Sequence, residues 1–182
     1  GFPVVDPTAA PIGDPNPDWR GSFGFTLKYK KFYLNALMEH SQGGDVINWT
    51  EGVLLDYGTS AATGFERVSD VPLKRYNGTT IPAGTPFRGN IKDFGAGNVA
   101  LDQSWYTGPG GWFGNVGELF LEDATWTRLR EINFGYTVTS DFLKKKAGIS
   151  SLGFEISGRN LFLISNVNGY DPDANNSGST SG

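Results

Sequence analysis

The sequence is poor in the residues that build disulfides, metal sites and transmembrane helices. It contains no cysteine and a single histidine, His40, among 182 residues. The lack of cysteine is compatible with an oxidising periplasm but excludes little. No stretch approaches the roughly 20 mostly apolar residues of a transmembrane helix. The first residues carry neither the basic region nor the apolar core of a signal peptide, so we expect a processed chain or a fragment.

Positive charge is scarce as well. There are 15 Lys and Arg against 19 Asp and Glu, which gives a net charge of −4 and an isoelectric point near 4.9. The only basic run, Lys144–Lys146, is short, and the sequence has no basic stripe. Because proteins that bind nucleic acid present clustered positive charge, nucleic-acid binding is disfavoured.

Signatures of catalysis are missing too. The sequence has no Ser/His/Asp arrangement, no Walker loop and no dinucleotide fingerprint. Glu118, Glu122 and Asp123 could be imagined as the paired carboxylates of a glycosidase, but acidic residues beside a strand are ordinary. His40 has no neighbouring nucleophile motif and is expected to be a satisfied or exposed histidine rather than a base. We therefore predict that the protein is not an enzyme and has no cofactor. A glycoside hydrolase ranks a distant third, behind the two non-enzymatic functions given below.

Aromatic and turn-forming residues are abundant. Aromatic residues make up 14% of the chain, all hydrophobic residues only 38%, and there are 26 Gly and 10 Pro. A low hydrophobic content with many aromatics suits a transmembrane β-barrel, in which apolar residues occupy alternate positions and aromatic girdles flank them. The same alternation would also suit a soluble β-sandwich, which is the commoner kind of β-domain.

Alternation of apolar and polar residues predicts an all-β chain with about four antiparallel strands, at residues 21–30, 32–41, 123–138 and 151–164. In the second strand, Leu37 interrupts the polar face. If Thr137 pairs with Gly153, Glu131 lies opposite Arg159, and we expect an ion pair there. Between the last two strands, Ser140 and Gly148 are placed to cap a short helix at residues 141–147.

Residues 42–121 show no sustained period. So long an irregular stretch counts against a compact soluble domain, but it suits one long extracellular loop of a barrel. A short helix is expected at residues 48–56. The segment carries an aromatic cluster among glycines, and flat aromatic rings either stack on sugars or anchor protein interfaces. Packing within the loop or against a partner is preferred here over ligand stacking for these four residues: Trp105, Tyr106, Trp112 and Phe113.

The end of the chain resembles the start of a calcium loop only in part. Asp171, Asp173 and Asn175 have the right spacing, but Asn176 stands where an EF-hand needs glycine. We therefore predict no metal site. The final residues 177–182 are of low complexity and are expected to be disordered.

Several motifs in order identify a resemblance. They are Gly13-Asp14-Pro15-Asn16-Pro17-Asp18-Trp19-Arg20, Tyr29-Lys30-Lys31-Phe32, Gly43-Gly44-Asp45-Val46, Thr127-Arg128-Leu129-Arg130-Glu131-Ile132-Asn133-Phe134-Gly135-Tyr136-Thr137, Leu143-Lys144-Lys145-Lys146-Ala147-Gly148-Ile149-Ser150-Ser151-Leu152, Ser157-Gly158-Arg159-Asn160-Leu161-Phe162 and Gly169-Tyr170-Asp171-Pro172. Each is weak alone, but their order and spacing resemble the C-terminal barrel strands of the SusC/RagA family of TonB-linked outer-membrane proteins. The matches run from about residue 13 to residue 173.

The resemblance implies a partial barrel of a TonB-dependent importer of oligosaccharides or peptides, in the outer membrane of a Bacteroidota-type bacterium. Residues 29–32 and 139–151 would be periplasmic turns, and residues 42–121 would be an extracellular loop. Glu131, Asn133, Glu155 and Arg159 would face the lumen, and the opposite face would meet outer-membrane lipid. TonB, acting through parts of the protein outside this chain, and a SusD-like surface lipoprotein would be the partners.

The family's plug domain and its closing strand are not in this sequence. Four strands leave unpaired edges that lipid does not tolerate, so we expect a part of a larger protein. The alternative is a soluble extracellular β-sandwich that binds glycan through Trp105, Trp112 and their neighbours.

Overall fold

The computed structural model describes residues 1–114 and 116–174 of the chain. By its internal contacts the chain divides into two units. Unit 1 consists of residues 1–13 and 46–122, and unit 2 of residues 14–45 and 123–182. Most of unit 1 is therefore inserted in the sequence between two segments of unit 2, and each unit is described by itself.

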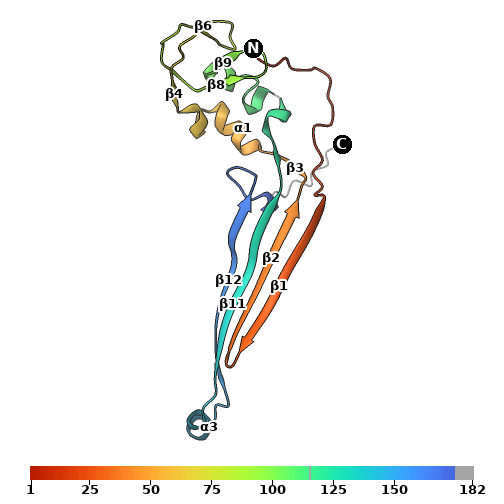
Figure 1. The fold of residues 1–182 in the computed structure, drawn as a ribbon, viewed down its shortest axis with the longest axis vertical. Helices are drawn as coiled ribbons and strands as arrows, with labels where there is room; N and C mark the ends of the chain where they lie inside the picture. Colours follow the sequence, from red (N-terminus) through yellow and green to blue (C-terminus); the bar gives the residue numbers. More distant parts are fainter. Residues whose placement is uncertain (115, 175–182) are drawn as a thin grey trace. The chain divides into compact units, whose positions relative to one another are not determined.

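Unit 2 is built on one antiparallel sheet of four long strands in the order β1-β2-β11-β12 (Figure 1). Their bounds are Trp19–Tyr29, Phe32–Gln42, Trp126–Val138 and Leu152–Ser165. They match the four stretches where alternation predicts strands to within three residues at each end. The largest differences are that β1 begins two residues before residue 21 and β11 three residues after residue 123. The hairpin between β1 and β2 closes at Lys30, whose φ is 54°.

The two faces of this sheet differ in polarity. Residues that pair across antiparallel strands point to the same face, so each row of partners belongs to one face. One such row is Leu27–Leu34–Phe134–Ile156, and the next is Thr26–Asn35–Asn133–Ser157. As the alternation predicts, Leu37 lies on the polar face, in the row of Gly24 and Glu131.

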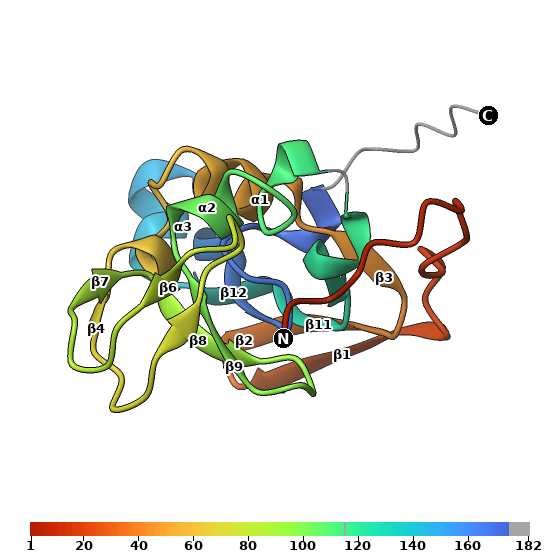
Figure 2. The same cartoon turned by 90° about the horizontal axis from the view of Figure 1, so that it is seen from above.

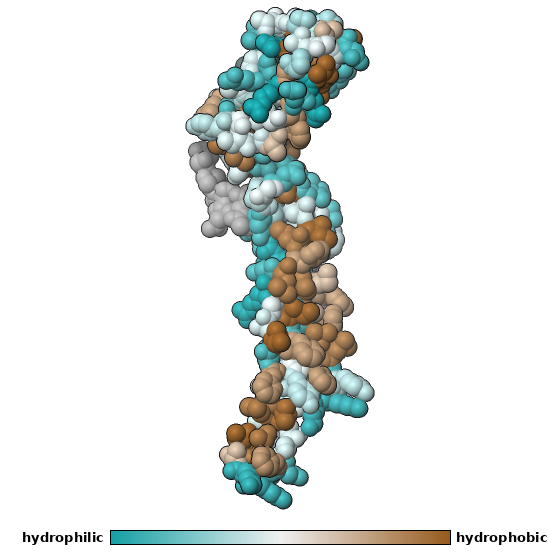
Figure 3. Space-filling model, turned by 90° about the vertical axis from the view of Figure 1, so that its left-hand side faces the viewer, coloured by the Kyte–Doolittle hydropathy of each residue, from teal (hydrophilic) through white to brown (hydrophobic). Residues whose placement is uncertain are grey.

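The apolar face of the sheet is exposed in the described chain. Hydrophobic residues gather along the strands (Figure 3). Phe23 is 66% exposed, Ile156 76% and Phe154 58%. Also exposed on this face are Phe25, Leu27, Tyr29, Phe32, Met38, Phe134, Leu152, Phe162 and Ile164. Soluble monomers rarely expose an apolar surface of this extent. We therefore expect another protein surface or a membrane to cover this face.

A β-bulge interrupts the alternation in β11. The register shifts between Leu129 and Glu131 in the pairings with both neighbouring strands. Arg128 pairs with Glu39 and Glu131 with Leu37, so both residues of β11 share the polar face although they are three apart. On β12 the matching irregularity includes Asn160, whose φ is 51°.

Helix α3, Asp141–Ala147, connects β11 to β12. The Ser140 hydroxyl accepts a hydrogen bond from the N–H of Phe142, and Gly148 ends the helix with a φ of 69°. The predicted N-terminal and C-terminal caps are therefore confirmed, because a left-handed C-cap favours glycine.

Unit 1 contains short strands and short helices. One sheet has the order β6-β5-β9-β8, β4 pairs with β7, and β3 pairs with β10; β8 and β9 lie side by side (Figure 2). The strands are β3 Asp45–Ile47, β4 Glu66–Arg67, β5 Leu73–Lys74, β6 Thr80–Ile81, β7 Phe87–Arg88, β8 Asn90–Asp93, β9 Asn98–Leu101 and β10 Leu121–Asp123. The α-helices are α1 Trp49–Asp56 and α2 Gln103–Tyr106, and 3-10 turns lie at Ala61–Thr63, Trp112–Gly114 and Gly117–Phe120.

The predicted helix at residues 48–56 is confirmed as α1. The side chain of Asn48 caps it by accepting the N–H of Glu51 at 3.0 Å. The sequence predicts an irregular structure for the rest of this segment, but the segment folds around two small cores. Leu73, Ile81, Phe87 and Ala100 form one, and Val99, Leu101, Trp105 and Tyr106 form the other. Strands of two to four residues are too short to produce a visible period in the sequence.

Among the described residues, no helix is both long and apolar enough to cross a membrane. The predicted disorder of residues 177–182 falls outside the described residues.

Candidate functional site

Trp105, the first of the four loop aromatics, lies in the core of unit 1. It is 3% exposed, and its ring stacks on that of Phe2, with centroids 5.4 Å apart. Tyr76 and Phe94 contact other sides of the same ring. A Cβ at Gly110 would lie 2.0 Å from the Trp105 Nε1, so this glycine is what lets the chain pass over the indole. Trp105 therefore stabilises unit 1 by packing.

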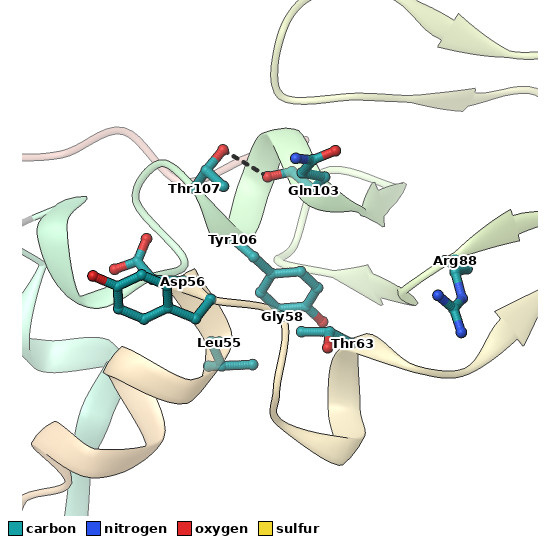
Figure 4. Close-up of a pocket in the computed structure, with 9 residues that line it drawn as sticks. Leu55, Asp56, Gly58, Thr63, Arg88, Gln103, Tyr106 and Thr107 are labelled. Atoms are coloured by element: carbon teal, nitrogen blue, oxygen red, sulfur yellow. Dashed lines mark hydrogen bonds between the residues drawn. The ribbon is translucent and has the colours of Figure 1, made fainter.

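Tyr106 forms one wall of a cavity of about 260 Å³ (Figure 4). Burial raises the pKa of its phenol, because the charged form is the one that loses hydration. The cavity is also lined by Asp56, Tyr57, Arg88, Gln103 and Thr107, and Thr107 donates its hydroxyl hydrogen bond to the Gln103 carbonyl at 2.8 Å. Aromatic, cationic, anionic and amide groups around one opening could hold a small polar molecule.

Phe113 is the most exposed of the four, at 64%. Its N–H donates to the Asp56 carboxylate at 2.9 Å, and its ring meets Tyr57 edge to face, with centroids 6.4 Å apart. Tyr57 is itself 72% exposed. We call Phe113 and Tyr57 the exposed aromatic pair. Trp112 is half-buried between the rings of Trp49 and Phe120.

The four residues therefore do not share one role in the structure. Trp105 and Tyr106 pack inward, Trp112 is intermediate, and Phe113 points outward. Contact of these four residues with a ligand or a partner stays a prediction. Phe113 is the best placed of them for such a contact because its ring is the most exposed. Tyr57 is not among the residues predicted from the sequence to contact a ligand or a partner. Its position directly after the predicted helix is the signal that could have identified it as an exposed aromatic residue.

Glu131, Asn133, Glu155 and Arg159, the other predicted site residues, lie on the polar face of the sheet in unit 2. Glu131 is opposite Arg159 and Thr137 opposite Gly153, as the sequence analysis expects. The Arg159 Nε lies 4.0 Å from the Glu131 carboxylate, and the Arg159 side chain is 77% exposed. The ion pair is thus present but long and solvated, so it stabilises little. Glu131 also accepts a hydrogen bond from the Asn133 amide.

Glu155 takes part in a contact that spans three strands. Tyr33 on β2 donates its phenolic hydrogen bond to the Glu155 carboxylate on β12 at 2.6 Å. Its ring crosses Gly135 on β11, where an added Cβ would lie 2.1 Å from the Tyr33 Cε1. The missing side chain of Gly135 therefore makes room for the tyrosine.

A cluster of charges near the start of β11 was missed by the sequence analysis. The Arg128 guanidinium pairs with Asp171, and Arg130 pairs with both Glu39 and Asp173. These two aspartates were considered as calcium ligands, but in the structure arginines neutralise them. Asn175, the third residue of that pattern, lies outside the described residues. The bulge in β11 brings this cluster onto the polar face, and a bulge has no clear signal in a single sequence.

The described residues contain no group of three or more His, Asp or Glu side chains placed to hold a metal ion. Hydrogen bonds from Thr125 and then Asn166 lower the pKa of Asp123, the opposite of what a general acid needs. His40 is satisfied, as expected, because its ring nitrogens lie 2.7 Å from the Thr127 hydroxyl and 3.2 Å from the Gln42 amide oxygen.

No model of a known protein family matches the chain. Two curated proteins of Formosa agariphila are similar to it along most of its length. TonB-dependent receptor P3 is 27% identical over 164 residues, which cover 90% of the chain, and TonB-dependent receptor P39 is 25% identical over 167 residues, which cover 92%. The match spans 14% of the length of either receptor. The chain is therefore distantly similar to a small portion of TonB-dependent receptors.

Proposed function

We propose that this chain is a wall-and-loop portion of a TonB-dependent importer in the bacterial outer membrane. The observation that carries the proposal is the sheet of unit 2, which has one polar face and one exposed apolar face rich in aromatic residues. Strands of a membrane barrel alternate in this way because lipid meets one face and water the other. The distant similarity to TonB-dependent receptors supports the same reading.

The length of the strands is also compatible with a membrane. β1 and β2 have 11 residues each, β11 has 13 and β12 has 14. A tilted strand needs roughly 9–11 residues to cross the hydrocarbon core. The sheet edges at β1 and β12 would pair with further strands outside this chain, because lipid does not tolerate unpaired backbone groups.

In this proposal the barrel wall is that of a SusC/RagA-like protein, and unit 1 is an extracellular elaboration. Glu131, Asn133, Glu155 and Arg159 line the lumen. The exposed aromatic pair, Phe113 and Tyr57, contacts a SusD-like lipoprotein or an oligosaccharide or peptide ligand. TonB acts through parts of the protein outside this chain. The protein imports its ligand and carries out no chemistry on it.

The decisive experiment asks which face of β12 meets hydrocarbon. Ile156 and Ser157 are neighbours on opposite faces, and both are exposed in the described chain. Each is replaced by cysteine in the full-length protein freed of any other cysteine, labelled with a small fluorophore, and folded into vesicles that contain brominated lipids. Because bromine quenches only on contact, the label at Ile156→Cys should be quenched strongly and the label at Ser157→Cys weakly.

Equal, weak quenching at both positions in a protein that remains soluble would refute the proposal. It would favour the soluble β-sandwich, in which a second sheet covers the apolar face. Strong quenching at Ser157 alone would mean that the two faces have been assigned the wrong way round.

A further inference from the structure

The lysines of the chain are concentrated at one end of the sheet in unit 2. The sequence has eight lysines, and five of them lie in the turns at residues 29–32 and 139–151. We call these five the basic end: Lys30, Lys31, Lys144, Lys145 and Lys146. Most of the lysine ammonium groups of a chain with a net charge of −4 therefore lie in two turns.

Two hydrogen bonds join the turn between β1 and β2 to the end of β11 and to the residue that follows it. The N–H of Thr137 donates to the Lys31 carbonyl at 2.9 Å, and the Lys31 ammonium donates to the Thr139 carbonyl at 3.4 Å. The turn between β1 and β2 and the start of the connection to α3 therefore lie side by side (Figure 1). The sequence alone shows two separate lysine groups, and the pairing of β2 with β11 brings both to the same end of the sheet.

The positive charge of the basic end is not neutralised within the described residues. All five lysines are exposed, and none forms an ion pair with a described residue. The only carboxylate in these two turns is that of Asp141, in the first turn of α3. Glu155 lies nearby on β12, where Tyr33 donates a hydrogen bond to it. The surface is therefore a site of net positive charge that is available to an anionic partner.

Exposed aromatic rings accompany the lysines. Tyr29 is 68% exposed and Phe142 67%. The Lys30 ammonium lies 5.2 Å from the Tyr29 ring and the Lys146 ammonium 5.9 Å from the Phe142 ring. The apolar face begins at Tyr29 itself, with the row Tyr29–Phe32–Tyr136–Phe154. Ammonium groups, then aromatic rings, then aliphatic side chains follow the order of polarity of a lipid headgroup region.

We propose that the basic end is a docking surface for the headgroups of anionic phospholipids. The inference rests on the proposed function, because it assumes that the apolar face meets lipid. A soluble acidic protein would satisfy the charges but not the adjoining apolar row, so the membrane is the better partner. Each lysine at an anionic lipid surface strengthens association by roughly fivefold at moderate salt, and screening weakens this.

The test measures which lipids the full-length protein retains. Purified protein is equilibrated with mixed micelles of phosphatidylglycerol and phosphatidylcholine and recovered, and its bound lipid is quantified by mass spectrometry. Wild type should retain phosphatidylglycerol preferentially at low salt. The Lys144→Gln/Lys145→Gln variant should lose that preference by roughly twenty-five-fold, since two lysines are removed.

Two variants serve as controls. Lys74→Gln/Lys92→Gln removes the same charge from exposed lysines of unit 1 and should behave as wild type. Lys144→Arg/Lys145→Arg keeps the charge and should keep the preference. An unchanged preference in Lys144→Gln/Lys145→Gln overturns the inference, and so does an equal loss in Lys74→Gln/Lys92→Gln.

Competition separates a lipid surface from a simple phosphate site. Millimolar inorganic phosphate that displaces phosphatidylglycerol would overturn the lipid assignment. A protein that shows bromine quenching at position 156 but no preference for anionic lipid would refute this inference and leave the proposed function standing. Absence of quenching would refute the proposed function itself.

Discussion

We predict that a side chain at Gly135 lowers the stability of the protein because the ring of Tyr33 lies across this position. In the sheet of unit 2, a Cβ on residue 135 would lie 2.1 Å from the Tyr33 Cε1 and 2.2 Å from its Cζ. Ordinary contact begins near 3.4 Å, so the Gly135→Ala change displaces the ring by about 1.3 Å. The tyrosine then moves away from Glu155, to which it donates its hydrogen bond.

Two opposing effects set the magnitude. Overpacking of this kind costs about 1–3 kcal/mol, whereas replacing a strand glycine by alanine contributes about 0.5–1 kcal/mol through backbone entropy. The net loss in stability for Gly135→Ala is therefore about 0–2.5 kcal/mol. In a Tyr33→Ala background the clash is gone, so the same change should stabilise the protein by about 0.5–1 kcal/mol.

The assay is a double-mutant cycle on the full-length protein folded in detergent or lipid, with urea midpoints for wild type, each single variant and the double variant. Gly153→Ala is the matched control, because a Cβ there meets nothing within 4 Å. A Gly135→Ala cost of the same size and sign in both backgrounds would refute the reasoning. It would mean that the glycine is required by the backbone and not by the tyrosine.

Two further predictions concern unit 1. Gly110→Ala should destabilise this unit by about 1–3 kcal/mol, because the added Cβ would lie 2.0 Å from the buried Trp105 ring. Thermal unfolding followed by tryptophan fluorescence measures this loss. Gly64→Ala is the control and should be nearly neutral, because the nearest contact of its Cβ is at 3.5 Å. Phe113→Ala should leave the free energy of unfolding within about 0.5 kcal/mol of that of wild type. It should weaken binding to the lipoprotein or to the ligand several-fold, and the affinity for each is measured separately. Phe65→Ala, at a ring that is 50% exposed, is the control, and an equal effect there would remove Phe113 from the interface.

The sequence could predict the sheet of unit 2 because long strands repeat their pattern. In β2, side chains alternate over the whole strand, and even Leu37 falls on the face that the pattern assigns to it. The opposition of Glu131 and Arg159 followed from simple counting once Thr137 was paired with Gly153. The caps of α3 were visible because serine and glycine are the residues that those positions favour.

The charge cluster and the structure of unit 1 could not be predicted in this way. The bulge at Arg130 reverses the phase of β11, so counting from Glu131 back to Arg128 assigns the arginine to the wrong face. In unit 1 the strands are shorter than the window in which a period can be recognised. The sequence favours packing within the loop or against a partner for Trp105, but it does not show that Gly110 is a glycine because the indole lies against it.

The insertion of unit 1 has a consequence for the order of folding. β2 must pair with β11, and the whole segment from Gly43 to Thr125 separates them in sequence. Closing so long a loop as a flexible chain is slow and costs entropy. Near the two ends of the inserted segment, however, the N–H of Asn48 donates to the Phe120 carbonyl at 2.8 Å and the Asn48 amide donates to the Glu122 carboxylate at 3.1 Å. If unit 1 folds first, these bonds shorten the effective connection to a few residues on each side, and the central strands can then join as rapidly as those of a local hairpin.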